Sequence, residues 1–206
     1  MKVLLLNGSP HETGCTYTAL CEVAAALKAE GVQSEIINIY GKTQGGCLAC
    51  GACGKLGKCV KDDLVNDLIP KLQECDGLVL GSPVHFASAS GEMVMLLDRL
   101  FYANRKWLKN KPGAAVVSCR RAGSTASLEV LQKYINYAQM PLVASQYWPM
   151  VHGATAEDVK QDKEGLQIMR QLGRNMAWLM KCIAAGRAAG IEDPAQEPAE
   201  RTNFIR

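Results

Sequence analysis

The chain has 206 residues, 48% of them hydrophobic, and a net charge of +3, which suits one globular α/β domain with a substantial core. Its lysines and arginines are spread rather than clustered, so we expect no nucleic-acid partner. The apolar run at 3–6 is too short for a signal peptide or a membrane span, so we expect a cytoplasmic protein with no membrane partner.

Short apolar runs alternate with amphipathic segments along the chain, which predicts repeated β–α units. This alternation predicts a five-stranded parallel sheet of order 2-1-3-4-5 with helices on both faces. We expect one domain over residues 1–185, followed at 186–206 by a tail or an oligomerisation arm. The expected strands are 2–6, 34–39, 77–81, 114–118 and 142–147, and the expected helices are 16–30, 62–74, 91–107, 127–139 and 163–185.

The loop after the first strand, residues 7–18, has the composition of an anion site. It combines glycines and hydroxyl side chains with the N-terminus of a helix, where backbone N–H groups favour a phosphate. It contains neither a Walker motif nor the Gly-x-Gly-x-x-Gly fingerprint, so a monophosphate fits better than a dinucleotide. The alternative is that Thr13 or Thr16 only caps the helix.

Two further loops follow strands that end at the same edge of the sheet. Residues 81–91 hold one aromatic side chain among small ones, which lets the backbone approach a flat ring such as isoalloxazine. Arg120 and Arg121 could stabilise a reduced flavin or a substrate phosphate, or they could be a solvated pair at a strand end. We interpret His85 as a hydrogen-bonded loop residue rather than an acid–base group.

Four of the nine cysteines form a dense C-x2-C-x2-C-x5-C pattern in a glycine-rich insertion at 45–60. We expect thiols, ligands or redox groups rather than disulfides, because cytosolic thiols stay reduced. The four residues of this pattern, Cys47, Cys50, Cys53 and Cys59, suit a [4Fe–4S] cluster, and a zinc site or free thiols stay open as alternatives. The other cysteines are expected to pack as small apolar groups. Cys15 is the exception, because a helix N-terminus could lower its pKa.

Together these motifs resemble the NADPH-dependent FMN reductase branch of the flavodoxin-like superfamily, and within it the iron–sulfur flavoproteins. The resemblance covers nearly the whole chain and implies a flavodoxin-like three-layer sandwich. His11, Cys15 and His85 stand where members usually carry Arg, Asn or Ser, and Tyr. The matching segments are Gly8-Ser9-Pro10, Gly14-Cys15-Thr16, Ser82-Pro83-Val84, Leu97-Asp98-Arg99 and the loop at 120–123.

The resemblance implies an FMN-dependent oxidoreductase that takes electrons from NAD(P)H and passes them to a quinone, a free flavin, oxygen or another small acceptor. The alternatives are an electron carrier between ferredoxin and an acceptor, and a zinc-stabilised binding module. Members are commonly homodimers or homotetramers. We expect no catalytic acid or base, because hydride transfer depends on orientation. The predicted cofactor contacts are Ser9, His11, Cys15, Thr16, Tyr17, Thr18, Pro83, Val84, His85, Phe86, Arg120, Arg121 and Gly123.

Overall fold

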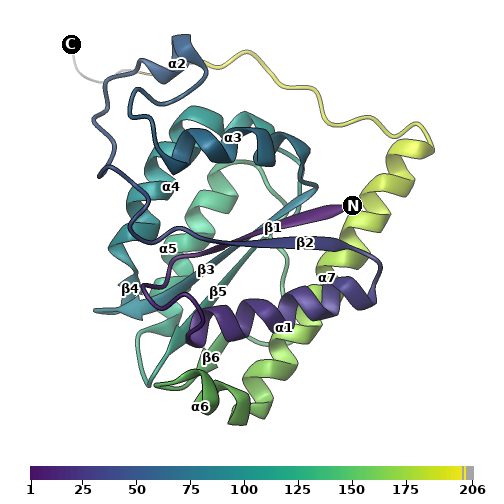
Figure 1. The fold of residues 1–206 in the computed structure, drawn as a ribbon. Helices are drawn as coiled ribbons and strands as arrows, with labels where there is room; N and C mark the ends of the chain where they lie inside the picture. The colour runs from purple at the N-terminus through teal and green to yellow at the C-terminus, as the bar shows by residue number, and fades with distance from the viewer. Residues whose placement is uncertain (201, 203–206) are drawn as a thin grey trace.

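The computed structural model describes residues 1–200 and 202 and shows a parallel sheet between two layers of helices (Figure 1). The parallel strands run in the order β2-β1-β3-β5-β6, while the short β4 pairs antiparallel with the end of β3. With β4 set aside, this is the predicted order 2-1-3-4-5, which is confirmed. The strands are β1 (Lys2–Asn7), β2 (Gln33–Asn38), β3 (Gly77–His85), β4 (Ser88–Ala89), β5 (Gly113–Cys119) and β6 (Met150–His152).

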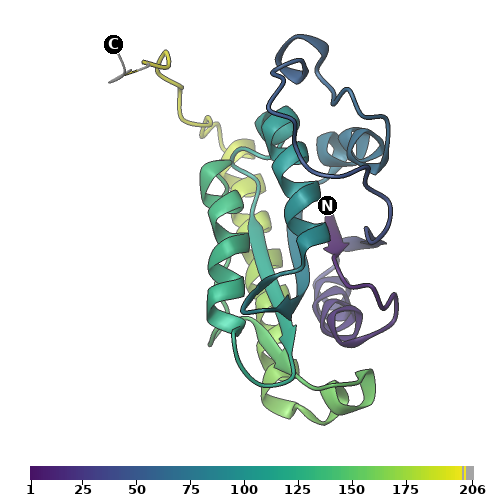
Figure 2. The ribbon, with the colours of Figure 1, turned by 90° about the vertical axis from the view of Figure 1, so that its left-hand side faces the viewer.

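The long helices divide between the two faces of the sheet. On one face lie α1 (Cys15–Ala29) and α7 (Lys163–Ala188), and on the other lie α3 (Leu64–Glu74), α4 (Gly91–Asn104) and α5 (Ser124–Tyr137). Two short helices, α2 (Cys53–Leu56) and α6 (Ala156–Gln161), were not predicted from the sequence, and the end of the predicted helix 91–107 is a 3-10 turn, η1 (Arg105–Trp107). Figure 2 shows the loop that carries α2 at one end of the molecule and α6 at the other.

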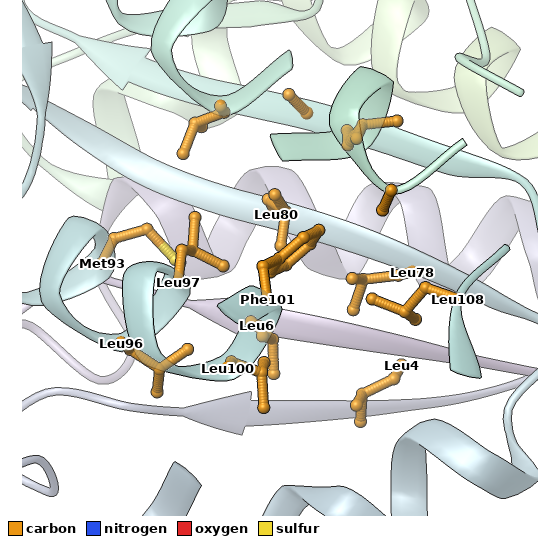
Figure 3. Packing of buried hydrophobic residues seen from close by; sticks show 14 of the residues in the cluster. Leu4, Leu6, Leu78, Leu80, Met93, Leu96, Leu97, Leu100, Phe101 and Leu108 are labelled. Atoms are coloured by element: carbon orange, nitrogen blue, oxygen red, sulfur yellow. The ribbon is translucent and has the colours of Figure 1, made fainter. Parts of the chain in front are cut away.

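The strand pleat explains how one sheet serves two cores. Successive side chains point to opposite faces, so Leu4 and Leu6 of β1 pack under α3, α4 and α5, while Val3 and Leu5 pack against α1 and α7. Each fully buried leucine contributes about 2 kcal/mol relative to an exposed one. Figure 3 shows the α4 side of this packing, where the following residues meet: Leu4, Leu6, Leu78, Leu80, Met93, Leu96, Leu97, Leu100 and Phe101.

The fifth strand was predicted in the wrong place. Instead of 142–147, the regular strand is Met150–His152, and the predicted segment makes only an isolated bridge from Leu142 to Gly113. The chain takes eight residues from Leu142 to Met150 while β5 takes four from Gly113 to Val117. The surplus residues cannot pair with β5 and leave the sheet edge as a loop. The apolar run at 142–147 thus indicated the correct edge of the sheet, but not which residues of this segment pair with β5.

Beyond α7 the described chain has neither helix nor strand and crosses the end of the molecule at which α2 lies (Figure 1). Arg187 pairs with Asp193, and Lys109 Nζ donates to the Pro194 carbonyl at 3.4 Å. Residues 201 and 203–206 of the predicted tail lie outside the described residues, and its role as an arm stays a prediction. Within the described part of the chain, no helix combines the length and apolarity that crossing a membrane requires.

Candidate functional site

The loops that leave β1, β3 and β5 meet at the carboxyl edge of the sheet. Gly8 N donates to the Gly81 carbonyl at 2.8 Å, and the Ser90 hydroxyl donates to the Gly8 carbonyl at 2.9 Å. The hydroxyls of Thr16 and Ser118 share a hydrogen bond of 2.9 Å. These bonds join the loop after β1 to β3 and to the start of α4, and join the start of α1 to the end of β5. The expected convergence of the three loops is therefore present, and they are tied to one another without any ligand.

The loop after β1 is shaped by two asparagines that the sequence analysis missed. Asn7 Oδ1 accepts from Ser9 N at 3.1 Å, and Asn38 Nδ2 donates to the Ser9 carbonyl at 2.9 Å. The Ser9 hydroxyl accepts from His11 N at 3.1 Å, and Gly14 N donates to the His11 carbonyl at 3.2 Å. Ser9 is buried while His11 is exposed. The signal available in the sequence was a polar residue ending each of two neighbouring apolar strands.

The N-terminus of α1 has no side-chain cap. Its N-cap residue is Gly14, which has no side chain that could accept from the N–H groups of the first turn. The N–H groups of the first turn, at Cys15, Thr16 and Tyr17, are therefore left for a ligand, and the helix dipole favours an anion there. This overturns the alternative in which a threonine caps the helix. Away from this position, α3, α4, α6 and α7 are all capped, by Asp63, Ser90, Thr155 and Asp162.

The side chains of the first turn mostly bond within the protein. Thr16 is fully buried against Ser118, and the Thr18 hydroxyl donates to the Gly14 carbonyl at 3.0 Å. The Cys15 thiol donates to the Gly153 carbonyl at 3.6 Å, and burial raises the pKa of this thiol rather than lowering it. An anion at this helix would therefore be held by backbone N–H groups more than by hydroxyls or a thiolate.

The end of β3 forms a strained hairpin with β4. Val84 and His85 pair with β4 across a two-residue turn, in which Phe86 and Ala87 have φ values of 50° and 55°. Left-handed backbone costs a non-glycine residue about 1–2 kcal/mol, and such strain concentrates at functional sites. Phe86 lies fully exposed at the tip, while Pro83 is half-buried before it. The hairpin presents an unpacked aromatic ring at the edge where the three loops converge.

The loop after β5 packs against this hairpin. Gly123 has a φ of 90°, and a Cβ at this position would lie 2.7 Å from Ala87 Cα, so only glycine fits. Gly123 is also the N-cap of α5 and makes no side-chain cap bond. Arg120 and Arg121 are exposed, and neither forms an ion pair with any residue among 1–200 and 202. Both cations remain available to a ligand at this edge.

The four cysteines of the insertion line one pocket that is open in part to solvent and has a cavity volume of only about 20 Å³. Cys47 and Cys50 are exposed, and Cys53 and Cys59 are half-buried. As they stand, no three His, Cys, Asp or Glu side chains in the described part of the chain are arranged to hold a metal ion. The donor set nonetheless fits a cluster, because four cysteines line one space and Ala49 N already donates to Cys47 Sγ at 3.4 Å.

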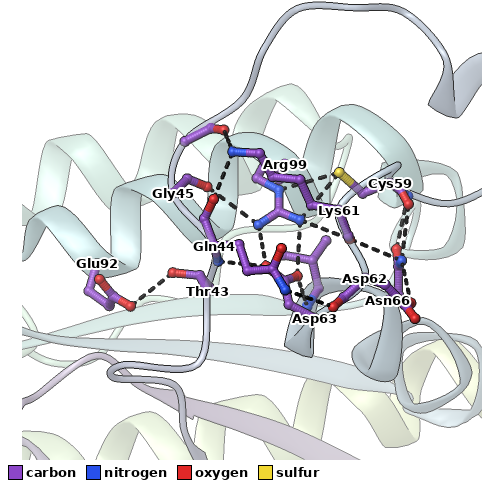
Figure 4. Close-up of polar contacts among 12 residues, drawn as sticks. Thr43, Gln44, Gly45, Cys59, Lys61, Asp62, Asp63, Asn66, Glu92 and Arg99 are labelled. Carbon is purple, nitrogen blue, oxygen red and sulfur yellow. Dashed lines mark hydrogen bonds and ion pairs between the residues drawn. The ribbon is translucent and has the colours of Figure 1, made fainter.

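The pocket is closed on the side of α4 by a buried ion pair (Figure 4). The side chains of Arg99 and Asp63 are 1% and 5% exposed, and the nitrogens of Arg99 lie 2.6 and 2.9 Å from the carboxylate oxygens. Burial alone would raise the pKa of Asp63, but Arg99 and the N–H groups of Gln44 and Val65 outweigh it, so this pKa lies below its usual value. Removing one partner would leave a buried charge unpaired.

The same guanidinium reaches the cysteine loop. Arg99 Nε and Nη2 each lie 3.3 Å from Cys59 Sγ, and Arg99 also donates to the carbonyls of Gly45 and Lys61 at 3.4 and 3.1 Å. Lys61 Nζ donates to the carbonyls of Gln44 and Gly46. The two ends of the insertion, at 44–46 and 59–61, are therefore hydrogen-bonded to each other and to α4. Arg99 was noted in the sequence only as part of a family motif, without this role.

The two candidate sites lie at different heights along α4. Near its first turn, Glu92 Oε1 accepts from Gly41 N at 3.1 Å and from the Thr43 hydroxyl at 2.8 Å. Ten residues later Tyr102 lines the cysteine pocket. At 1.5 Å per residue this is about 15 Å along the helix. The insertion thus begins at the carboxyl edge of the sheet and carries its cysteines away from it.

Comparison with known proteins gives a consistent picture. The model that describes the NADPH-dependent FMN reductase family matches residues 1–155. An iron–sulfur flavoprotein of Methanocaldococcus jannaschii is 32% identical over 192 residues, which cover 89% of this chain and 99% of the relative. The structure of RosB with a bound riboflavin-phosphate derivative is similar with a TM-score of 0.71 at 15% identity, covering 100% of this chain and 92% of RosB. A flavodoxin from the domain Archaea has a TM-score of 0.61 at 17% identity, covering 88% and 99%. The expected flavodoxin-like fold is confirmed.

Proposed function

The chain belongs to the NADPH-dependent FMN reductase family, and we propose that it is an FMN-dependent oxidoreductase that takes electrons from NAD(P)H. The acceptor we propose is a small molecule such as a quinone, a free flavin or oxygen. The observation that carries this proposal is the uncapped N-terminus of α1 at the carboxyl edge of the sheet, beside a strained hairpin and two free arginines. This arrangement supports a phosphate site next to a place for a flat ring.

The residues at this edge fit FMN. The N–H groups of Cys15, Thr16 and Tyr17 would hold the phosphate, with Ser9 and the exposed His11 beside it. The ring would lie along the hairpin at 83–86, whose backbone can donate to its polar rim. When bound, FMN supplies a ring that accepts a hydride and gives up its electrons to an acceptor.

The remaining tasks of the chain at this site are orientation and charge compensation. Arg120 and Arg121 would offset the negative charge that reduction adds, since a guanidinium keeps its charge and donates several hydrogen bonds. Gly123 lets the loop that carries these arginines approach the hairpin. The thiol of Cys119 at the end of β5 is buried and its pKa is raised, which makes it a poor nucleophile. We therefore assign no catalytic acid, base or nucleophile, because orientation of donor and acceptor suffices.

A second candidate function is electron transfer between ferredoxin and an acceptor through FMN and a [4Fe–4S] cluster. The observation that favours it is the pocket lined by all four cysteines of the motif, together with the iron–sulfur flavoprotein name of the similar Methanocaldococcus protein. Cys47, Cys50, Cys53 and Cys59 would hold the cluster, which supplies one-electron chemistry. All nine cysteines are free thiols, which is compatible with the cytoplasmic setting that we propose.

Anaerobic spectroscopy of the purified protein tests both functions. We expect the visible absorbance of an oxidised flavin, and bleaching of that absorbance when NADPH or NADH is added. Bleaching by reduced ferredoxin, but by neither nicotinamide, would favour the carrier over the reductase. A protein that stays colourless after FMN is supplied would refute both and leave a zinc-stabilised binding module. Zinc, iron and sulfide analysis on the same sample identifies what the cysteines hold.

We also propose a homodimer or homotetramer. The described surface carries large exposed aromatic side chains, including Tyr137 and Trp178, which are both 67% exposed. Aromatic residues are enriched at protein interfaces. Sedimentation or light scattering of the FMN-loaded protein measures the subunit number, and a monomer at micromolar concentration would contradict the proposal.

A further inference from the structure

We propose that Arg99 positions the iron–sulfur site by holding the Cys59 sulfur in place and donating hydrogen bonds to it, which makes Cys59 the anchoring ligand. This inference rests on the proposed cluster in the cysteine pocket. It adds a role for a residue of α4 that lies 40 positions away from Cys59 in the chain.

Arg99 occupies a buried position in which a charged side chain is unfavourable unless it is paired. It lies on the buried side of α4 and is only 2% exposed, among leucines such as Leu96 and Leu100. Charged side chains are almost never fully buried unless they are paired. Asp63 supplies the pairing charge. However, the ion pair uses only Nη1 and Nη2 as donors to Asp63, while Nε and Nη2 face Cys59.

Cys59 is held at both its backbone and its sulfur. Its N–H donates to Asn66 Oδ1 at 2.9 Å, and its carbonyl accepts from Asn66 Nδ2 at 3.0 Å. Its sulfur accepts the two bonds from Arg99 at 3.3 Å, and its side chain packs against the core beside α4 (Figure 4). The position of this sulfur is thus set by the folded domain and not by a metal.

The other three cysteines are held much less. Cys47 and Cys50 are exposed, and Cys53 begins α2, a helix of four residues. The sulfur of Cys47 accepts one bond, from Ala49 N. Three of the expected ligands lie on the segment 47–53, and the fourth, Cys59, is bonded to the core. Cluster assembly would therefore bring this segment up to Cys59.

The fork shape of the guanidinium explains why arginine serves here. Its five N–H donors lie in one plane, so Arg99 can pair with Asp63 along one edge and face the Cys59 sulfur with another. A lysine would keep the charge for Asp63 but would present its donors from a single point. Hydrogen bonds to ligand sulfurs stabilise the more negative, reduced cluster and raise its reduction potential. The substitution Arg99→Lys therefore separates sulfur donation from charge pairing.

The experiment compares the cluster-loaded parent protein with Arg99→Lys under anaerobic conditions. We measure iron and sulfide per chain, the reduction potential of the cluster, and the rate at which iron passes to a chelator. The variant should have a lower potential than the parent and should lose iron about tenfold faster, as expected when a partner of a metal ligand is removed. The potential is the decisive readout, since a purely structural contact would leave it unchanged.

Arg170→Lys is the matched control, because Arg170 pairs with Glu22 on the opposite face of the sheet and forms no hydrogen bond with a cysteine of the described residues. This control should keep both the potential and the iron-loss rate of the parent. If Arg99→Lys fails to fold, the double variant Arg99→Met with Asp63→Asn takes its place. It leaves no unpaired buried charge and keeps a good N-cap for α3, and the same two changes are expected.

The outcomes separate this inference from the proposed function. A parent protein that takes up no iron and sulfide would overturn the cluster and this role of Arg99 together. A loaded parent whose potential and iron-loss rate match those of Arg99→Lys would overturn the role of Arg99 alone, and the cluster would stand.

Discussion

The carboxyl edge of the sheet and the cysteine pocket differ in how far their binding groups are arranged before a ligand arrives. At the edge, the N–H groups of α1 project from a helix whose start is joined to the end of β5 by the bond between Thr16 and Ser118. In the pocket, the Cys59 sulfur is held by Arg99, while Cys47 and Cys50 are exposed on the outer part of the insertion. The groups of the first proposed site are thus held in place on all sides, and those of the second on one side only.

This difference follows from what each site is built on. The edge uses strand ends and a helix N-terminus, whose geometry is set by the sheet itself. The pocket uses a surface insertion, in which glycines with left-handed backbone, such as Gly45, Gly51 and Gly57, allow turns but pack against little. We therefore expect FMN binding to depend on the domain alone, and cluster binding to depend on closure of the insertion. The two should respond separately to substitution.

Cys59→Ser gives the largest expected effect on this comparison. The hydroxyl keeps an acceptor for Arg99 but is a poor ligand for iron, so cluster content should fall to background. The flavin content per chain should stay at the level of the parent, because the pocket residues Arg99 and Tyr102 lie about 10–15 Å along α4 from Glu92 near the edge. Iron, sulfide and flavin analyses of the same preparation measure both. Joint loss of cluster and flavin would show that the sites are one unit and would break the comparison.

A charge placed at the start of α1 tests the preformed site. Tyr17→Glu puts a carboxylate beside the first-turn N–H groups, where it favours the helix by about 0.3–1 kcal/mol. The same charge repels a phosphate at that position, and two unit charges 4 Å apart near a protein surface interact by about 4 kcal/mol. We expect FMN affinity to fall about a hundredfold relative to Tyr17→Gln, the neutral control of equal size. Fluorescence titration with FMN, and urea unfolding without it, measure the two opposite effects.

The two Tyr17 variants must differ for the phosphate site to stand. Equal FMN affinity of Tyr17→Glu and Tyr17→Gln would mean that no phosphate approaches this helix. In that case the uncapped N-terminus of α1 at Gly14 would make no contribution to flavin binding.

The architecture could be predicted from the sequence because it depends on local alternation. The apolar period of β1 and of α7 is strong, so α7 begins at Lys163, where the pattern placed it. The fifth strand was misplaced because both Leu142–Val143 and Met150–Val151 are apolar, and only pairing with β5 decides between them. Register against a neighbouring strand is a tertiary property, and the pattern of one segment does not contain it.

The site was predictable in its loops and not in its contacts. The glycines and the cysteine spacing predict both candidate regions, whereas the contacts of Asn7 and Asn38 depend on hydrogen bonds between neighbouring loops. The expected side-chain donor Thr16 is instead used inside the protein. Arg99 reaches a sulfur 40 positions away, and a helical pattern reports only which face of the helix is apolar. Long-range pairing of polar side chains is what the sequence alone leaves open.

Gly123→Ala gives the smallest expected effect and probes how tightly the edge is assembled. A methyl group there must adopt a φ of 90° and would meet Ala87 Cα at 2.7 Å. Gly31→Ala is the matched control, because Gly31 also has a positive φ, of 77°, but nothing lies within 4 Å of the added carbon. Both variants pay the strain of left-handed backbone, about 1–2 kcal/mol. Gly123→Ala should lose about 1 kcal/mol more through overpacking.

Urea unfolding of the FMN-free protein measures this difference, and FMN titration shows its consequence for the site. Displacing the hairpin should weaken FMN binding in Gly123→Ala and leave it unchanged in Gly31→Ala. If the two variants lose equal stability and bind FMN equally well, then the hairpin and the loop after β5 are not in the close contact described above. The carboxyl edge would then resemble the cysteine insertion, as a site that takes its final form only around its ligand.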